Sequence, residues 1–276
     1  MPGIRKILFP VDFSQRSIGA ARYVECFAGW FDAEILLLHV MDAASAESGQ
    51  EQLQSFLSGE LKQFSTRRVC TTGDPADEIV KMVRSWAPDL VMMPTYGMGF
   101  YRPYLLGSVT AKVLHDVDCP VWTAVHAEAA PPLEKITLSR VLCALDLGQR
   151  SPRVLEWAAW FAKQHQGSLG LVHATAIVEP VPGAQPAGVL EQELADFLAA
   201  EARGGLAILQ RAAGTNAMVL VNGGEPSKVA ACAVKDLRAG LLVIGRHSGR
   251  GANGNGYLRH TAYEIIRESP CPVISI

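Results

Sequence analysis

The segment from Tyr96 to Thr110 has the residue types that bind an anion. Gly107 and Ser108 stand at the start of a predicted helix. Glycine lets a phosphate approach the backbone closely, and the first amides of a helix point outward toward such a group. Ser108 adds a hydroxyl donor, and Arg102 adds a positive charge. The alternative is that Gly107 only permits a turn and Ser108 only caps the helix, and this segment alone does not decide between the two.

A carboxylate follows the first predicted strand. Asp12 comes directly after the apolar run from Ile4 to Val11. An ionised carboxylate at the end of a strand can accept hydrogen bonds from a ribose or from the amino group of an adenine. The alternative is that Asp12 helps to cap the following helix, a frequent role for aspartate.

Other residues that invite a catalytic interpretation have simpler explanations. His39 and His173 each end a buried apolar strand, which favours a structural role. The sequence has no H-E-x-x-H motif, no Walker-type G-x-x-x-x-G-K-[ST] and no recognisable nucleophile–base pair. The run from Gly249 to Gly254 fits G-x-G-x-x-G, but it follows a fourth strand, whereas a dinucleotide fingerprint follows the first strand of its unit.

The chain is an internal duplication, and the same short segments recur in the same order. Asp12 and His39 match Asp146 and His173 at one offset, 134 residues, and Pro75 matches Pro226 at an offset of 151. The larger offset predicts an insertion in the second copy. The matching segments are 7–12 with 141–146, 35–40 with 169–174, 73–76 with 224–227, 89–93 with 240–244 and 119–121 with 271–273, and the insertion is expected at 180–188.

Each copy alternates apolar runs with helical patterns. Runs that are apolar throughout are typical of strands covered by helices on both faces, and strand–helix alternation predicts a parallel, doubly wound sheet. Ligands of such sheets bind beyond the carboxyl ends of the strands, which selects the loops with Asp12 and Gly107. In the first copy we expect strands at 4–11, 35–40, 68–71, 90–93 and 121–125, and helices from Ser14, at 47–64, from Asp74 and at 108–114.

Two domains follow from the duplication, at residues 1–127 and 139–276, joined by a polar, proline-rich linker at 128–138. The last strand of each copy, Val121 to Val125 and Val273 to Ile276, is apolar and is expected at a sheet edge. An unpaired edge is a template for association. We therefore expect the two edges to pair within the chain as a pseudo-dimer, and two chains to form a homodimer.

Composition narrows the function classes. The formal net charge is −2 with both signs mixed along the chain, which excludes the basic face of a nucleic-acid-binding protein. No apolar run is long enough to cross a bilayer, and the first residues lack a signal-peptide layout, so we expect a cytoplasmic protein without a membrane partner. The six scattered cysteines form no C-x-x-C pair and are interpreted as small buried apolar residues.

Taken together, these segments resemble universal stress protein domains, in both halves and over nearly the whole chain. The ATP-binding subgroup of that family has a glycine, two residues, a second glycine, nine residues, and then glycine followed by Ser or Thr. Here Gly97 is followed by nine residues and then by Gly107 and Ser108. The segments 6–14, 38–40 and 119–121 are also similar to the family.

The resemblance implies two tandem Rossmann-like domains of the adenine nucleotide alpha hydrolase-like type, each a five-stranded parallel sheet flanked by helices. It implies a stress-response regulatory protein that binds ATP, or AMP or ADP, with Mg²⁺ as the ion that would accompany ATP and an unknown protein as partner. By the same resemblance the adenosine pocket is lined by Pro10, Val11, Asp12 and Val40, and the phosphates are held by Gly97, Gly107, Ser108, Val109 and Thr110.

The sequence departs from the family motif in both halves. The first glycine of the motif is Pro94, which has no N–H to donate. In the second half, Ser248 replaces the second glycine and Arg259-His260 replaces the Gly-Ser pair. We therefore expect a nucleotide in the first domain only. Two alternatives stay open, a protein-interaction scaffold without a nucleotide and a weak ATPase, although no base for the attacking water of an ATPase can be named.

Overall fold

The computed structural model describes residues 3–41, 46–96, 106–177, 189–246 and 256–276. The chain divides into two compact units. The first unit consists of Met1–Ile136 with Arg246–Gly256 and Ile274–Ile276, and the second of Thr137–Gly245 with Tyr257–Val273. The bounds predicted for the two domains and their linker stay a prediction.

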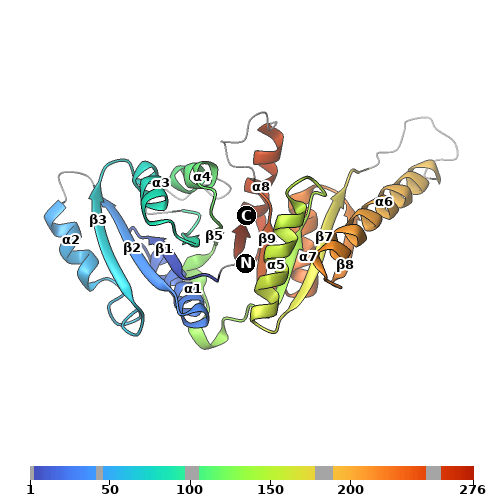
Figure 1. The fold of residues 1–276 in the computed structure, drawn as a ribbon. Coiled ribbons are helices and arrows are strands. Elements are labelled where there is room, and N and C mark those ends of the chain that lie inside the picture. The colour runs from blue at the N-terminus through green and yellow to red at the C-terminus, as the bar shows by residue number, and fades with distance from the viewer. Residues whose placement is uncertain (1–2, 42–45, 97–105, 178–188, 247–255) are drawn as a thin grey trace. The chain divides into compact units, whose positions relative to one another are not determined.

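The first half contains a sheet of five strands (Figure 1) in the order β3-β2-β1-β4-β5. All of its neighbouring strands are parallel. The central strand β1 is paired on both sides, since Leu8 lies beside Leu36 of β2 and Val91 of β4. The strands are β1 Lys6–Pro10, β2 Glu34–Met41, β3 Thr66–Thr72, β4 Leu90–Met92 and β5 Val121–Thr123. This arrangement brings the ends of β1 and β4 side by side, as the sequence predicts.

Four helices cover this sheet: α1 Gln15–Phe31, α2 Ala46–Ser55, α3 Pro75–Trp86 and α4 Ser108–Asp116. Ser14 is the N-cap of α1, because its side chain accepts a hydrogen bond from the amide of Ser17. Asp74 caps α3 in the same way through the amide of Asp77. Both helix starts are confirmed.

Two expectations from the sequence are wrong, one about a helix of the first half and one about the cysteines. The helix predicted at 47–64 ends at Ser55, because Leu57 adopts a left-handed backbone with φ 55° and the following residues form turns. The interpretation of all six cysteines as buried fails at Cys232, which is exposed.

The second half repeats the architecture with the strand order β10-β9-β6-β7-β8. Its strands are β6 Arg140–Ala144, β7 Ser168–Thr175, β8 Met218–Gly223, β9 Leu241–Ile244 and β10 Val273–Ser275, and its helices are α5 Ser151–Gln164, α6 Val189–Ala213, α7 Pro226–Leu237 and α8 Gly256–Glu268. The 25-residue helix α6 stands where the first half has the 10-residue α2. The insertion predicted at 180–188 lies outside the described residues.

The start of the predicted linker packs against α1. Two short 3₁₀ helices, η2 Ala127–Ala129 and η3 Leu133–Lys135, form this segment. Gly19 of α1 lies so close to η2 that a Cβ on it would be 1.8 Å from the carbonyl oxygen of Ala127. Arg16 forms an ion pair with Glu128 at 3.2 Å. This part of the linker is therefore held on the first unit.

Candidate functional site

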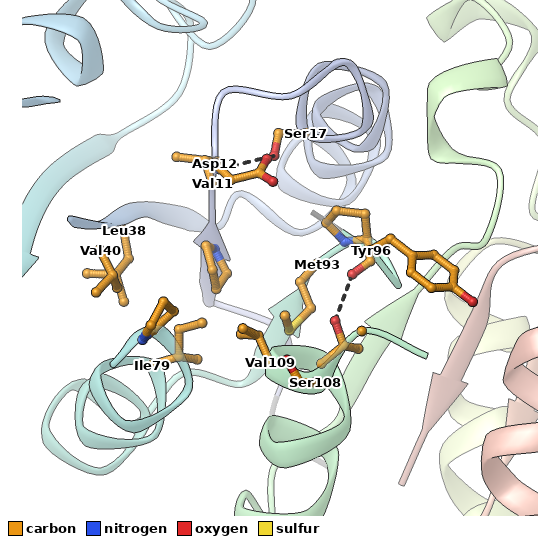
Figure 2. Close-up of a pocket in the computed structure, with 15 residues that line it drawn as sticks. Val11, Asp12, Ser17, Leu38, Val40, Ile79, Met93, Tyr96, Ser108 and Val109 are labelled. Atoms are coloured by element: carbon orange, nitrogen blue, oxygen red, sulfur yellow. Dashed lines mark hydrogen bonds between the residues drawn. The ribbon is translucent and has the colours of Figure 1, made fainter. Parts of the chain in front are cut away.

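A cavity of about 380 Å³ lies beyond the carboxyl ends of β1 and β4 (Figure 2). It is lined by Pro10, Val11, Asp12, Ser17, Leu38, Val40, Pro75, Ile79, Met93, Pro94, Tyr96, Gly107, Ser108, Val109 and Thr110. Eight of the nine predicted site residues are in this set. The ninth, Gly97, lies outside the described residues, as does Arg102. The structure thus brings the two predicted loops to one cavity, while the ligand contacts themselves stay a prediction.

Asp12 is held in place by one of its two carboxylate oxygens. Oδ1 accepts hydrogen bonds from the amide of Ser14 at 3.1 Å, from the Ser14 hydroxyl at 2.6 Å and from the Ser17 hydroxyl at 2.7 Å. The other oxygen, Oδ2, is buried and has no hydrogen-bond partner in the part of the chain that the structure describes. Since a buried polar atom without a partner costs free energy, Oδ2 is suited to a donor from a ligand. Asp12 therefore supports the helix start without being its cap.

The backbone around Asp12 is fixed by a histidine and a strained turn. His39 Nδ1 donates to the carbonyl oxygen of Val11 at 2.8 Å. Phe13 has a φ of 62°, a left-handed conformation that is unusual for a bulky residue, and its ring lies 4.1 Å from the His39 ring. The second half has the same device, with Leu147 at φ 60° and His173 Nδ1 2.7 Å from the carbonyl of Leu145. The structural interpretation of both histidines is confirmed.

The start of α4 faces the same cavity and has a glycine as its N-cap. Its N-cap is Gly107, which has no side chain with which to cap the first amides of the helix. The interpretation of Ser108 as the cap is therefore wrong. Gly107 donates its amide to the carbonyl of Thr95 at 2.9 Å, and a Cβ on Gly107 would lie 2.9 Å from that same oxygen. Gly107 is thus needed for the close approach of α4 to the chain after β4, and the amides of the first helical turn carry partial positive charge.

Pro94 lies in the wall of the cavity and is bound to α4 by a hydrogen bond. The hydroxyl of Thr110 donates to the Pro94 carbonyl at 3.1 Å, and Thr110 is buried. This hydroxyl is therefore used inside the protein, and only the main chain of Thr110 is left for a ligand. The proline costs the site an amide donor but leaves the carbonyl that anchors the helix.

Among the cavity-lining residues that the structure describes, Asp12 is the one carboxylate, and none is Lys, Arg or His. Lys112 belongs to α4 but does not line the cavity, and it forms ion pairs with Asp77 at 2.6 Å and Asp74 at 3.6 Å. Among the described residues, the positive potential in the cavity therefore comes from the helix start. In the same residues no group of three or more His, Cys, Asp or Glu could hold a metal ion.

The corresponding residues of the second half are arranged differently. Asp146 is exposed, and its Oδ1 accepts from the amide of Gly148 and the hydroxyl of Ser151, both at 2.8 Å. Arg259 and His260 lie inside α8 rather than before it. His260 is exposed and pairs with Glu264 of its own helix at 3.1 Å. The glycine N-cap of α4 in the first half thus has no counterpart at Arg259 and His260.

Sequence reasoning missed several residues that line the cavity: Ser17, Leu38, Pro75, Ile79, Met93 and Tyr96. Two of them could have been predicted from their positions in the sequence. Leu38 lies two positions before Val40 on β2, so it faces the same side of the sheet, and Ser17 lies in the first turn of α1. Pro75 and Ile79 come from α3, whose position over the cavity only the three-dimensional fold determines.

The described helices include none that is both long enough and apolar enough to cross a membrane.

Comparisons with known proteins agree on one family. The model of the universal stress protein family matches residues 3–124 and 137–276. Two universal stress proteins of Methanocaldococcus jannaschii are 28% and 31% identical over 149 and 135 residues, which is 42% of this chain and 92% and 79% of theirs. A crystal structure of a universal stress protein from Archaeoglobus fulgidus has the same fold, with a TM-score of 0.72 and 23% identity, covering 99% of this chain and 96% of that one.

Proposed function

The chain belongs to the universal stress protein family as a tandem of two such domains, and we propose that its first domain binds an adenine nucleotide in the cavity between β1 and α4. We propose a regulatory role, in which the bound nucleotide alters a surface that another protein recognises. The second domain does not bind a nucleotide in this proposal. The protein acts as a cytoplasmic binding protein rather than as an enzyme.

The observation that carries the proposal is the unpartnered carboxylate oxygen of Asp12. An ionised carboxylate only accepts hydrogen bonds, so Oδ2 calls for a donor. The hydroxyls of a ribose and the amino group of an adenine are such donors. A ligand that supplies one of them removes the cost of the buried, unsatisfied oxygen.

The opposite side of the cavity is suited to a phosphate. The N-cap Gly107 has no side chain to occupy the first amides of α4, and these amides carry the positive end of the helix dipole. Ser108 lines the cavity and can add its hydroxyl. A nucleoside phosphate has both of the polar features that this cavity calls for. Its nucleoside provides a hydrogen-bond donor for Asp12, and its phosphate provides an anion for the start of α4.

The wall between these two ends is apolar and suited to a base. Leu38 and Val40 come from β2 and Val11 directly follows β1, while Ile79, Met93 and Val109 close the cavity from other parts of the unit (Figure 2). A flat aromatic base is stabilised by removal of its faces from water, and ligand sites in general combine apolar walls with a few placed polar groups. The adenine preference itself comes from membership of the family and is part of the proposal.

The proposal is tested by calorimetric titration of the full chain with ATP, ADP, AMP and GTP. Asp12→Asn keeps the size of the side chain and replaces an acceptor oxygen by a donor. Since a hydrogen bond to a charged group contributes about 1.5–3 kcal/mol, we expect the affinity to fall roughly 10- to 100-fold. The matched control is Asp146→Asn in the second half, which should leave the affinity unchanged.

Two results would contradict the proposal. Absence of saturable binding of any of these nucleotides by the wild-type chain would favour the scaffold alternative. Equal loss of affinity in Asp12→Asn and Asp146→Asn would show that the loss is not specific to the first cavity. ATP hydrolysis that is lost in Asp12→Asn would instead support the weak ATPase.

A further inference from the structure

Helix α6 of the second half carries an apolar stripe on its outer side. Leu194, Phe197 and Ile208 are 46%, 59% and 61% exposed. Their spacing places them on one side of the helix, whereas Ala202 and Leu206 are buried against the rest of their unit. The N-terminal part of α6 extends away from the sheet of this unit (Figure 1). The helix thus has two apolar sides, and its own unit covers one of them.

A glycine lies in the middle of this stripe. A glycine inside a helix is unfavourable by about 1 kcal/mol relative to alanine, so it usually has a reason in the packing. The neighbouring Gly205 has such a reason, because a Cβ on it would lie 3.2 Å from the Leu147 side chain. A Cβ on Gly204 would meet nothing within 4 Å. Nothing in the described part of the chain therefore requires glycine at this position, while the close approach of a second helix would.

The charges along α6 are separated by sign. The N-terminal part carries Glu191, Glu193, Asp196 and Glu201, and the C-terminal part carries Arg203 and Arg211. A second α6 in the antiparallel direction sets the acidic part of each helix against the basic part of the other. A parallel pair would set like charges together.

We propose that α6 pairs in the antiparallel direction with α6 of a second copy of this chain and so forms a homodimer. The stripe residues 194, 197, 201, 204, 208 and 211 alternate in steps of three and four, the spacing of a helix–helix seam. With the two-fold axis between residues 202 and 203, Phe197 lies opposite Ile208 of the second copy and Glu201 lies opposite its Gly204. Glu193 then flanks Arg211 of the second copy, on the same side of the seam.

This pairing explains three features together: the exposed apolar side chains, the glycine and the order of the charges. The seam from residue 194 to residue 211 is about 26 Å long at 1.5 Å per residue. The inference does not depend on the proposed nucleotide site, because it uses only residues of the second half.

Sedimentation velocity of the full chain over a concentration series tests the pairing. We expect a monomer–dimer equilibrium. Arg211→Glu places two carboxylates together at each end of the seam and should raise the dissociation constant roughly tenfold or more. Glu193→Arg should do the same, and the double variant Glu193→Arg/Arg211→Glu should restore the wild-type value. Arg203→Glu is the matched control, since it makes the same charge change on the side of α6 away from the stripe.

Gly204→Ala gives a second test, because it should affect the stability of the monomer and the affinity of the dimer in opposite directions. Alanine should raise the melting temperature of the monomer, because it favours the helix, and should weaken the dimer, because it separates the two backbones. The pairing is overturned if the chain stays monomeric at all concentrations. It is also overturned if a dimer forms that Arg211→Glu and Gly204→Ala leave unchanged, since another surface then holds it, or if the double charge exchange fails to restore what the single changes remove.

Discussion

Substitution of Gly107 by alanine isolates the contact that holds the start of α4 at the cavity. The φ of Gly107 is −58°, which alanine adopts without strain, so the backbone conformation is not the issue. The new Cβ would lie 2.9 Å from the Thr95 carbonyl oxygen, which is also the acceptor of the Gly107 amide. The helix start and Thr95 must therefore move apart, and the hydrogen bond between them must lengthen.

The expected magnitude follows from these two effects. Forcing an extra carbon into a filled space costs about 1–3 kcal/mol, and a weakened backbone hydrogen bond adds about 0.5–1.5 kcal/mol. We expect Gly107→Ala to lower the free energy of unfolding by about 2 kcal/mol, measured by urea denaturation. Gly59→Ala is the control, since a Cβ on Gly59 meets nothing within 4 Å.

Ligand binding shows whether Gly107→Ala disturbs the phosphate site alone or the whole cavity. If the phosphate lies against the first amides of α4, Gly107→Ala should weaken binding of AMP and ATP by roughly tenfold, which is about 1.4 kcal/mol. Binding of adenosine, which has no phosphate, should change much less. An equal loss for adenosine and AMP would refute the assignment of the phosphate to α4, and an unchanged stability would refute the close contact with Thr95.

Three further predictions concern other parts of the chain. Ser14→Ala removes the N-cap of α1 and should lower the free energy of unfolding by about 1 kcal/mol in urea denaturation, whereas a change within error would show that the cap is dispensable. Gly19→Ala places a Cβ against the Ala127 carbonyl and should lower the melting temperature more than Gly107→Ala does, and an equal or higher melting temperature would contradict the close contact of the linker with α1. At neutral pH, Ellman's reagent should react fastest with the exposed Cys232, since burial raises the pKa of the Cys26 thiol to about 11, and Cys232→Ser should remove this fast phase.

The sequence predicted the fold well where local signals agree with the tertiary structure. The apolar runs gave the strands, and Ser14 and Asp74 marked two helix starts because each provides a side-chain oxygen to an otherwise unpaired amide. The duplication gave the two halves. The end of α2 was not predictable in this way, because the left-handed conformation of Leu57 has no glycine to signal it.

The candidate site was predictable in part. The rule that ligands bind beyond the carboxyl ends of parallel strands predicted the loops after β1 and β4, and the structure places both at one cavity. The contribution of α3 through Ile79 depends on how that helix crosses the sheet, which no local pattern encodes. The unpartnered oxygen of Asp12 could not be predicted from the sequence either. It results from the local geometry, in which three donors all bind the other carboxylate oxygen.

A crystal structure of the full chain grown with AMP or ATP tests the central proposal most directly. We expect density for one nucleotide per chain, with a donor of its adenosine on Asp12 Oδ2 and a phosphate on the first amides of α4. A cavity that stays without nucleotide at saturating concentration, or a nucleotide bound elsewhere, would contradict the account.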